Sequence, residues 1–71
     1  MEYRFFQDKD NESTIIRVGY EDKKTKTVEW WNYKDKEFVS SDRAYNILMD
    51  AENTREIDGK TAEKEIDKYT E

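Results

Sequence analysis

In the first forty residues, short apolar stretches alternate with charged turns, and this pattern predicts a series of β-strands. The predicted strands cover residues 2–7, 14–20, 27–33 and 37–39. They are rich in aromatic and β-branched side chains, as half-buried strands are. Because consecutive strands joined by short turns pair with one another, we expect a three- to four-stranded antiparallel meander. Gly19, near the end of the second strand, predicts a bulge or a close backbone approach.

After residue 40 the apolar positions follow a helical period. From Ala44 to Ala51 they recur at i, i+3, i+4 and i+7, which predicts a helix over residues 41–52 with Ser40 as its N-cap. A break follows. Asp58 is then the predicted N-cap of a second helix over residues 59–69. The expected fold is a single α+β domain in which both C-terminal helices pack on one face of the sheet.

Side-chain alternation along the strands sorts the apolar residues into two faces. The face expected to lie under the helices carries Phe5, Ile16, Val18, Val28, Trp30 and Phe38. The other face is aromatic but interleaved with charge, and it carries Arg4, Phe6, Ile15, Arg17, Glu29, Trp31 and Tyr33. Two short helices are expected to cover only the first face, so the second face is predicted to be open to solvent or covered by a partner.

The composition removes most catalytic chemistry. The chain has no His, no Cys and no Pro, so it lacks Ser–His and Cys–His nucleophile pairs and soft-metal ligands. Residues 8–13 resemble the opening of a calcium loop, but Ser13 stands where that loop needs Gly and Gly19 where it needs Glu. We therefore expect no enzymatic activity, no cofactor and no metal.

The charge is acidic and lies mostly in the second half of the chain. The net charge is −5, and residues 41–71 carry 9 acidic against 5 basic side chains. This balance disfavours direct nucleic-acid binding and suits a basic protein partner. No apolar run reaches the roughly 18 residues that span a bilayer, and the N-terminus lacks a signal-peptide layout, so a cytoplasmic location is expected.

These patterns favour a non-enzymatic protein-binding module. Its sharpest form is a small acidic inhibitor or accessory protein of a phage or mobile element, acting on a basic, nucleic-acid-handling partner such as a host defence nuclease. Contact area is predicted from Arg4, Phe6, Arg17, Trp31 and Tyr33, and electrostatic steering from Glu56, Glu63 and Asp67. One alternative is single-stranded nucleic-acid binding through the exposed aromatic face. Another is a structural homodimer with no further activity, since a 71-residue chain builds only a small core.

Overall fold

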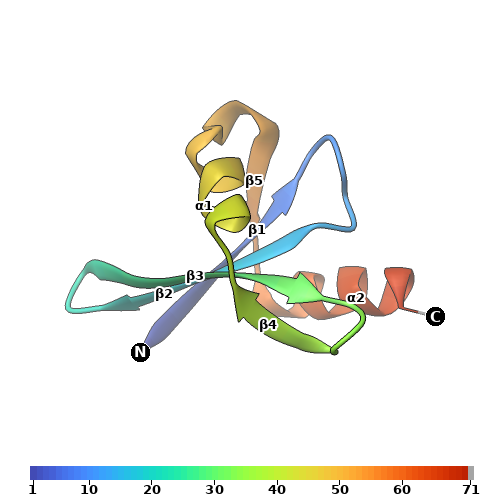
Figure 1. Ribbon diagram of the computed structural model, residues 1–71, viewed down its shortest axis with the longest axis horizontal. Coiled ribbons are helices and arrows are strands. Elements are labelled where there is room, and N and C mark those ends of the chain that lie inside the picture. The colour runs from blue at the N-terminus through green and yellow to red at the C-terminus, as the bar shows by residue number, and fades with distance from the viewer. Residues whose placement is uncertain (71) are drawn as a thin grey trace.

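The computed structural model describes residues 1–70 as a five-stranded antiparallel sheet with two helices (Figure 1). The first four strands form the predicted meander, and the α+β class is confirmed. Along the sheet the strand order is β4-β3-β2-β1-β5. The strands are β1 (Glu2–Asp8), β2 (Ile15–Glu21), β3 (Lys24–Asn32), β4 (Glu37–Ser40) and β5 (Thr54–Ile57). The helices are α1 (Asp42–Met49) and α2 (Gly59–Tyr69), and a short 3₁₀ turn, η1 (Ala51–Asn53), precedes β5.

β5 was not predicted from the sequence, which indicates only a break between two helices there. It pairs antiparallel with the outer edge of β1, from Phe5 opposite Ile57 to Asp8 opposite Thr54. Its partner is nearly fifty residues away in the chain, and a local pattern carries no signal of such a pairing. A fully buried side chain, Gln7, holds it in place by accepting hydrogen bonds from Arg55 Nε and Nη2 at 3.0 and 2.6 Å.

The first helix is shorter than predicted and starts one residue later. Ser41, not Ser40, is the N-cap, and its hydroxyl accepts a hydrogen bond from the Arg43 amide at 3.1 Å. The helix ends at Met49 because the backbone turns at Asp50, whose amide donates to the Ile47 carbonyl at 3.1 Å. The second helix has the predicted bounds and the predicted N-cap, since Asp58 accepts a hydrogen bond from the Thr61 amide at 2.7 Å.

The prediction that both helices pack on one face is wrong. α1 buries Ala44 against Ile16 and Val18 of β2 on one face. α2 lies beside Phe5 and Arg17, whose side chains point to the opposite face because they alternate with the first set. Figure 1 shows the two helices well apart, with α1 at the top and α2 at the lower right. Each helix therefore covers its own side of the sheet.

The register between strands also corrects the predicted faces. Phe6, Ile16 and Trp30 are directly paired across β1, β2 and β3, so Phe6 belongs to the α1 face. Phe5 is paired with Arg17, so it belongs to the α2 face. Alternation within one strand fixes which residues share a side, but it leaves the register of the next strand open. The sorting was therefore inverted for β1, and for Phe38 of β4.

The main hydrophobic core lies between α1 and the sheet, and a smaller set of buried residues lies on the opposite face, under α2. Ile16, Val18 and Ala44 are fully buried. Partly buried side chains complete this cluster, namely Phe6, Tyr20, Val28, Trp30, Ile47 and Leu48. On the other face, Ile15 is fully buried and Ala62 of α2 is almost so. Small residues at the two helix contacts let each helix approach the sheet closely.

Gly19 has the role that the sequence predicts. The pairing of β2 with β3 shifts between Gly19 and Tyr20, which is a β-bulge. A Cβ atom at Gly19 would lie 2.7 Å from Met1 Sδ and would collide with Thr27 Oγ1. A side chain at this position would therefore force Thr27 and Met1 to shift.

Candidate functional site

Arg17 is the centre of an aromatic and charged cluster on the α2 face. Its Nη2 donates to Glu29 Oε1 at 2.9 Å, and its Nε donates to the same oxygen at 3.2 Å. The guanidinium carbon lies 4.2 Å from the ring centre of Phe38 and 4.5 Å from that of Tyr3. Two rings and a carboxylate therefore hold the arginine, and it contributes more to the local packing than to an outside contact.

A groove runs beside this cluster, between α2 and the β3–β4 hairpin. It consists of two adjoining hollows of about 370 and 490 Å³ that share Phe38, Glu63 and Ile66. We call it the α2 groove. One end is bordered by Phe5, Arg17, Gly59, Lys60 and Ala62, and the other end by Trp31, Lys36, Asp67 and Thr70.

The floor of the α2 groove is apolar. Trp31 meets the Phe38 ring nearly edge-on, with ring centres 5.1 Å apart and an angle of 73° between the planes. Ile66 of α2 completes this floor. The indole Nε1 of Trp31 is buried and has no hydrogen-bond partner within residues 1–70. A partly exposed floor of aromatic and aliphatic side chains has the composition of a binding surface.

Tyr33 is fixed at the edge of this region. Its hydroxyl donates to the Ser13 carbonyl at 2.6 Å, which ties the β3–β4 hairpin to the β1–β2 loop. Burial raises the pKa of Tyr33, and the nearby Tyr69 and Glu65 raise it further. Trp31 packs against it with ring centres 6.4 Å apart. The prediction of an open aromatic face is therefore wrong in part, because α2 covers one side of it while Trp31 and Phe38 stay half-buried and line the groove.

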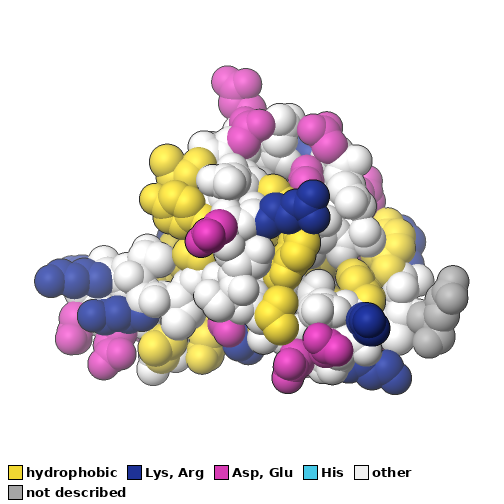
Figure 2. All heavy atoms as spheres, in the orientation of Figure 1, with side chains coloured by type: hydrophobic (Ala, Val, Ile, Leu, Met, Phe, Trp, Pro, Cys, Tyr) yellow, Lys and Arg dark blue, Asp and Glu magenta, His cyan; other side chains and the backbone are white. Residues whose placement is uncertain are grey.

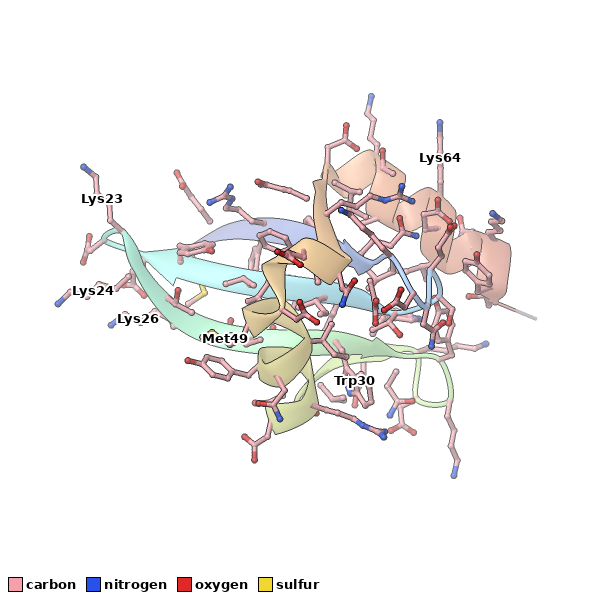
Figure 3. All side chains as sticks on the ribbon, turned by 90° about the horizontal axis from the view of Figure 1, so that it is seen from above. Lys23, Lys24, Lys26, Trp30, Met49 and Lys64 are labelled. Atoms are coloured by element: carbon pink, nitrogen blue, oxygen red, sulfur yellow. The ribbon has the colours of Figure 1, made fainter. Side chains whose placement is uncertain are left out.

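The border of the groove carries both charges: α2 contributes the carboxylates of Glu63 and Asp67, and Lys60 and Lys36 lie at the two ends. Glu63 and Asp67 lie four residues apart and are both exposed. At this spacing they share one side of the helix. Lys64, by contrast, points outward from α2 (Figure 3). Within the described chain no basic side chain forms a salt bridge with Glu63 or Asp67.

The remaining predicted site residues lie on the α1 face. Arg4 donates from Nε to Glu56 Oε2 at 2.7 Å and from Nη2 to Glu56 Oε1, and this ion pair joins β1 to β5. The pair raises the pKa of Arg4 and lowers that of Glu56. Phe6 lies beneath the Arg4 guanidinium, 5.8 Å from it, and packs against the core. The structure therefore separates Arg4, Phe6 and Glu56 from the other five predicted residues.

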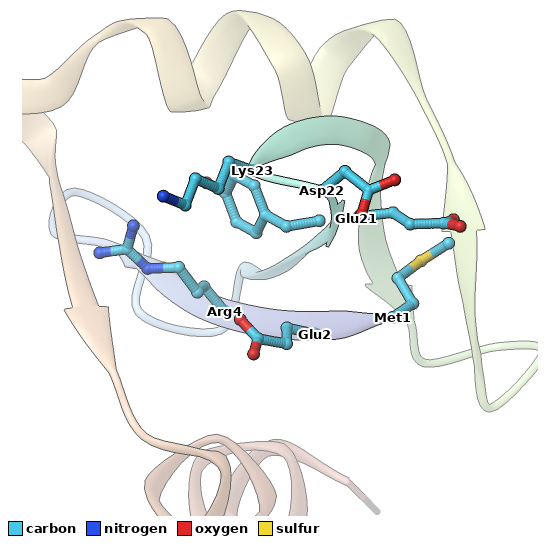
Figure 4. Close-up of a pocket in the computed structure, with 7 residues that line it drawn as sticks. Met1, Glu2, Arg4, Glu21, Asp22 and Lys23 are labelled. Carbon is cyan, nitrogen blue, oxygen red and sulfur yellow. The ribbon is translucent and has the colours of Figure 1, made fainter.

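A separate hollow, of about 590 Å³, lies beside Arg4 on the α1 face (Figure 4). It is lined by side chains of both charges, including Glu2, Glu21, Asp22 and Lys23. Arg4 is already bonded to Glu56.

Another group of acidic residues lies where the β1–β2 loop meets the connection from α1 to β5. The Lys9 amide donates to the Asn53 carbonyl at 2.7 Å, which joins these two segments. Figure 2 shows acidic side chains gathered at the top of the molecule, over the α1–β5 connection. We call this region the acidic end, and it comprises Asp8, Asp10, Glu12, Asp50 and Glu52. It was not among the predicted site residues.

Sequence reasoning missed Ile66, Lys36 and Thr70 as groove residues and assigned Phe38 to the wrong face. Ile66 is an apolar residue inside the predicted second helix, so its burial was foreseeable. Its contact with the aromatic strands was not, because that depends on which face the helix covers. Among residues 1–70, no acidic side chains are grouped so that they could hold a metal ion, and no helix is long and apolar enough to cross a membrane.

The chain matches no protein-family model, no curated protein and no solved structure.

Proposed function

We propose that the protein is a non-enzymatic protein-binding module that takes a basic segment of its partner into the α2 groove. One observation carries this proposal: an apolar floor of Trp31, Phe38 and Ile66 is bordered by the exposed carboxylates of Glu63 and Asp67. Aromatic and aliphatic anchors at the centre with charge at the border are the usual anatomy of a protein interface.

The dimensions of the groove favour a segment over a folded surface. Two hollows of about 370 and 490 Å³ accept a few side chains in a row. Lysine or arginine stems in such a segment would pack on the aromatic floor, while their charged ends would meet the two carboxylates. Exposed charges of this kind contribute more to the association rate and to partner choice than to affinity.

The partner class follows from charge. A net charge of −5 and the acidic end would steer a basic protein toward this molecule over distances of about a Debye length. Basic proteins that handle nucleic acids fit this description. We therefore propose an inhibitor or accessory protein of phage or mobile-element type, acting in the cytoplasm on such a partner.

Affinity capture from a bacterial lysate with three immobilised baits tests the proposal. The baits are the native protein, Glu63→Lys with Asp67→Lys at the groove, and Glu12→Lys with Glu52→Lys at the acidic end. The two variants have the same net charge, and all four side chains are exposed. Basic proteins should be retained by the native bait and by the acidic-end variant, but lost from the groove variant. Loss from both variants alike would contradict the assignment to the groove.

A further inference from the structure

The α2 groove opens beside a free edge of the sheet. β4 is the last strand on its side, and within residues 1–70 no strand pairs with its outer edge. An edge strand presents unpaired N–H and C=O groups that can accept another strand. On the basis of the function proposed above, we propose that the partner segment binds as an added antiparallel β-strand along β4.

The two sheet edges differ in how they are protected. At the opposite edge, Arg55 and Glu56 of β5 are both charged and both engaged with β1. β4 has the sequence Glu-Phe-Val-Ser, with one charged residue, no proline and no register shift in its pairing with β3. Short strands, charged residues, prolines and bulges are the common devices that stop an edge from pairing. Both edge strands have four residues, but β4 carries fewer charged side chains than β5, so it is the edge better suited to an added strand.

The alternation of side chains fixes what such a strand must contain. Phe38 points to the α2 face, and its neighbours Glu37 and Val39 point to the α1 face. The partner residue opposite Phe38 would therefore enter the groove, and the residues two positions before and after it would lie on the same side. An apolar residue at the centre suits the floor of Trp31 and Ile66. Basic residues at the flanking positions suit Glu63 and Asp67, and one of these positions lies beyond the start of β4, opposite Lys36.

The occupant is thus an extended segment in which one face reads basic, apolar, basic. Main-chain hydrogen bonds to β4 would supply affinity, and the groove would select the alternate side chains, as in other cases of strand addition. A second copy of the chain is a poorer occupant, because both copies would bring the same acidic border to the contact.

A synthetic peptide tests this directly. The probe is the end-capped heptapeptide Thr-Lys-Thr-Leu-Thr-Lys-Thr, called here the lysine–leucine peptide. Backbone amide exchange of the ¹⁵N-labelled native protein is followed by NMR with and without it. We expect the exposed amides of Phe38–Ser40 to exchange about tenfold more slowly in the complex, and the Trp31 indole resonance to shift.

Two backbone-methylated peptides provide the matched control. In one, the amides of the lysines and leucine are N-methylated, and in the other the amides of the threonines between them. In an added strand only one of these two sets faces β4. One methylated peptide should therefore lose about tenfold or more in affinity while the other binds nearly as the parent does.

The outcomes separate the two proposals. If the peptide shifts the Trp31 resonance but both methylated forms bind equally and β4 is not protected, strand addition is wrong and the groove remains the binding site. If no peptide binds at concentrations up to about 1 mM, both proposals fail. If β4 is already protected without peptide and sedimentation shows a dimer, a second copy occupies the edge, which overturns the partner assignment.

Discussion

The guanidinium of Arg17 lies 4.2 Å from the ring centre of Phe38, two strands away, while its Nη2 bonds to Glu29 at 2.9 Å. This relationship joins β2, β3 and β4 on one face of the sheet. Arg17 packs against the aromatic floor of the α2 groove and pairs with Glu29, so Glu63 and Asp67 are not engaged by it. The stability of this face and its capacity to bind can therefore be changed separately.

Replacing Arg17 should destabilise the protein. Arg17→Met keeps the stem but leaves the Glu29 carboxylate, whose side chain is only 19% exposed, without its partner. We expect a loss of about 1–2 kcal/mol in the free energy of unfolding, measured by urea denaturation. Arg17→Met with Glu29→Met should recover most of this loss. A single variant as stable as the native protein would show that the cluster contributes nothing.

Gly19→Ala should also destabilise, for a steric reason. Its Cβ would collide with Thr27 Oγ1 and crowd Met1 Sδ and the Tyr3 ring. Overpacking of this kind costs roughly 1–3 kcal/mol in the free energy of unfolding. Thr27→Ala removes the colliding oxygen, which is buried without a hydrogen-bond partner in the described chain. Gly19→Ala should therefore cost clearly less in the Thr27→Ala background, and an equal cost in both backgrounds would rule out this contact as the cause.

A glycine in the turn between β2 and β3 should stabilise the protein. Asp22 and Lys23 adopt φ values of 53° and 64°, a left-handed conformation that costs energy for residues with a side chain. Lys23→Gly should raise the free energy of unfolding by about 0.5–1 kcal/mol. Lys26→Gly removes the same charge from the same hairpin at a residue outside the left-handed region, and it should destabilise. Figure 3 shows both lysines at the end of this hairpin. If the two substitutions change the free energy of unfolding equally, the loss of charge and not the backbone conformation is the cause.

The Arg4–Glu56 pair predicts a pH dependence of stability. Because Arg4 lowers the pKa of Glu56 below its ordinary value of 4.5, the carboxylate stabilises the folded state above that value. This contribution is lost as the pH falls through the lowered pKa. Glu56→Gln should therefore have a lower Tm than the native protein at neutral pH, and the two values should converge in acid. Glu52→Gln, at the acidic end, serves as the control for net charge. A constant difference across the pH range would contradict the ion pair.

The sequence predicted the meander, both helices and the bulge at Gly19, because each depends on segments close together in the chain. It failed where distant segments meet. β5 forms because the free edge of β1 and the buried Gln7 accept it. The side of the sheet that α2 covers depends in turn on where β5 ends, and that placement decides whether Trp31 is open or covered. Glu63 and Asp67 were singled out as candidates from the sequence, but only the fold places them beside Trp31.

The central claim is that the α2 groove, and not acidity in general, binds a basic segment. The most direct measurement is the affinity of the lysine–leucine peptide for two charge-matched variants. Glu63→Gln with Asp67→Asn neutralises the two carboxylates of the groove border, and Glu12→Gln with Glu52→Gln neutralises two carboxylates of the acidic end. The groove variant should bind about tenfold more weakly than the native protein, and the acidic-end variant within about twofold of it. Equal weakening in both variants would show that net charge alone attracts the peptide and would contradict the groove.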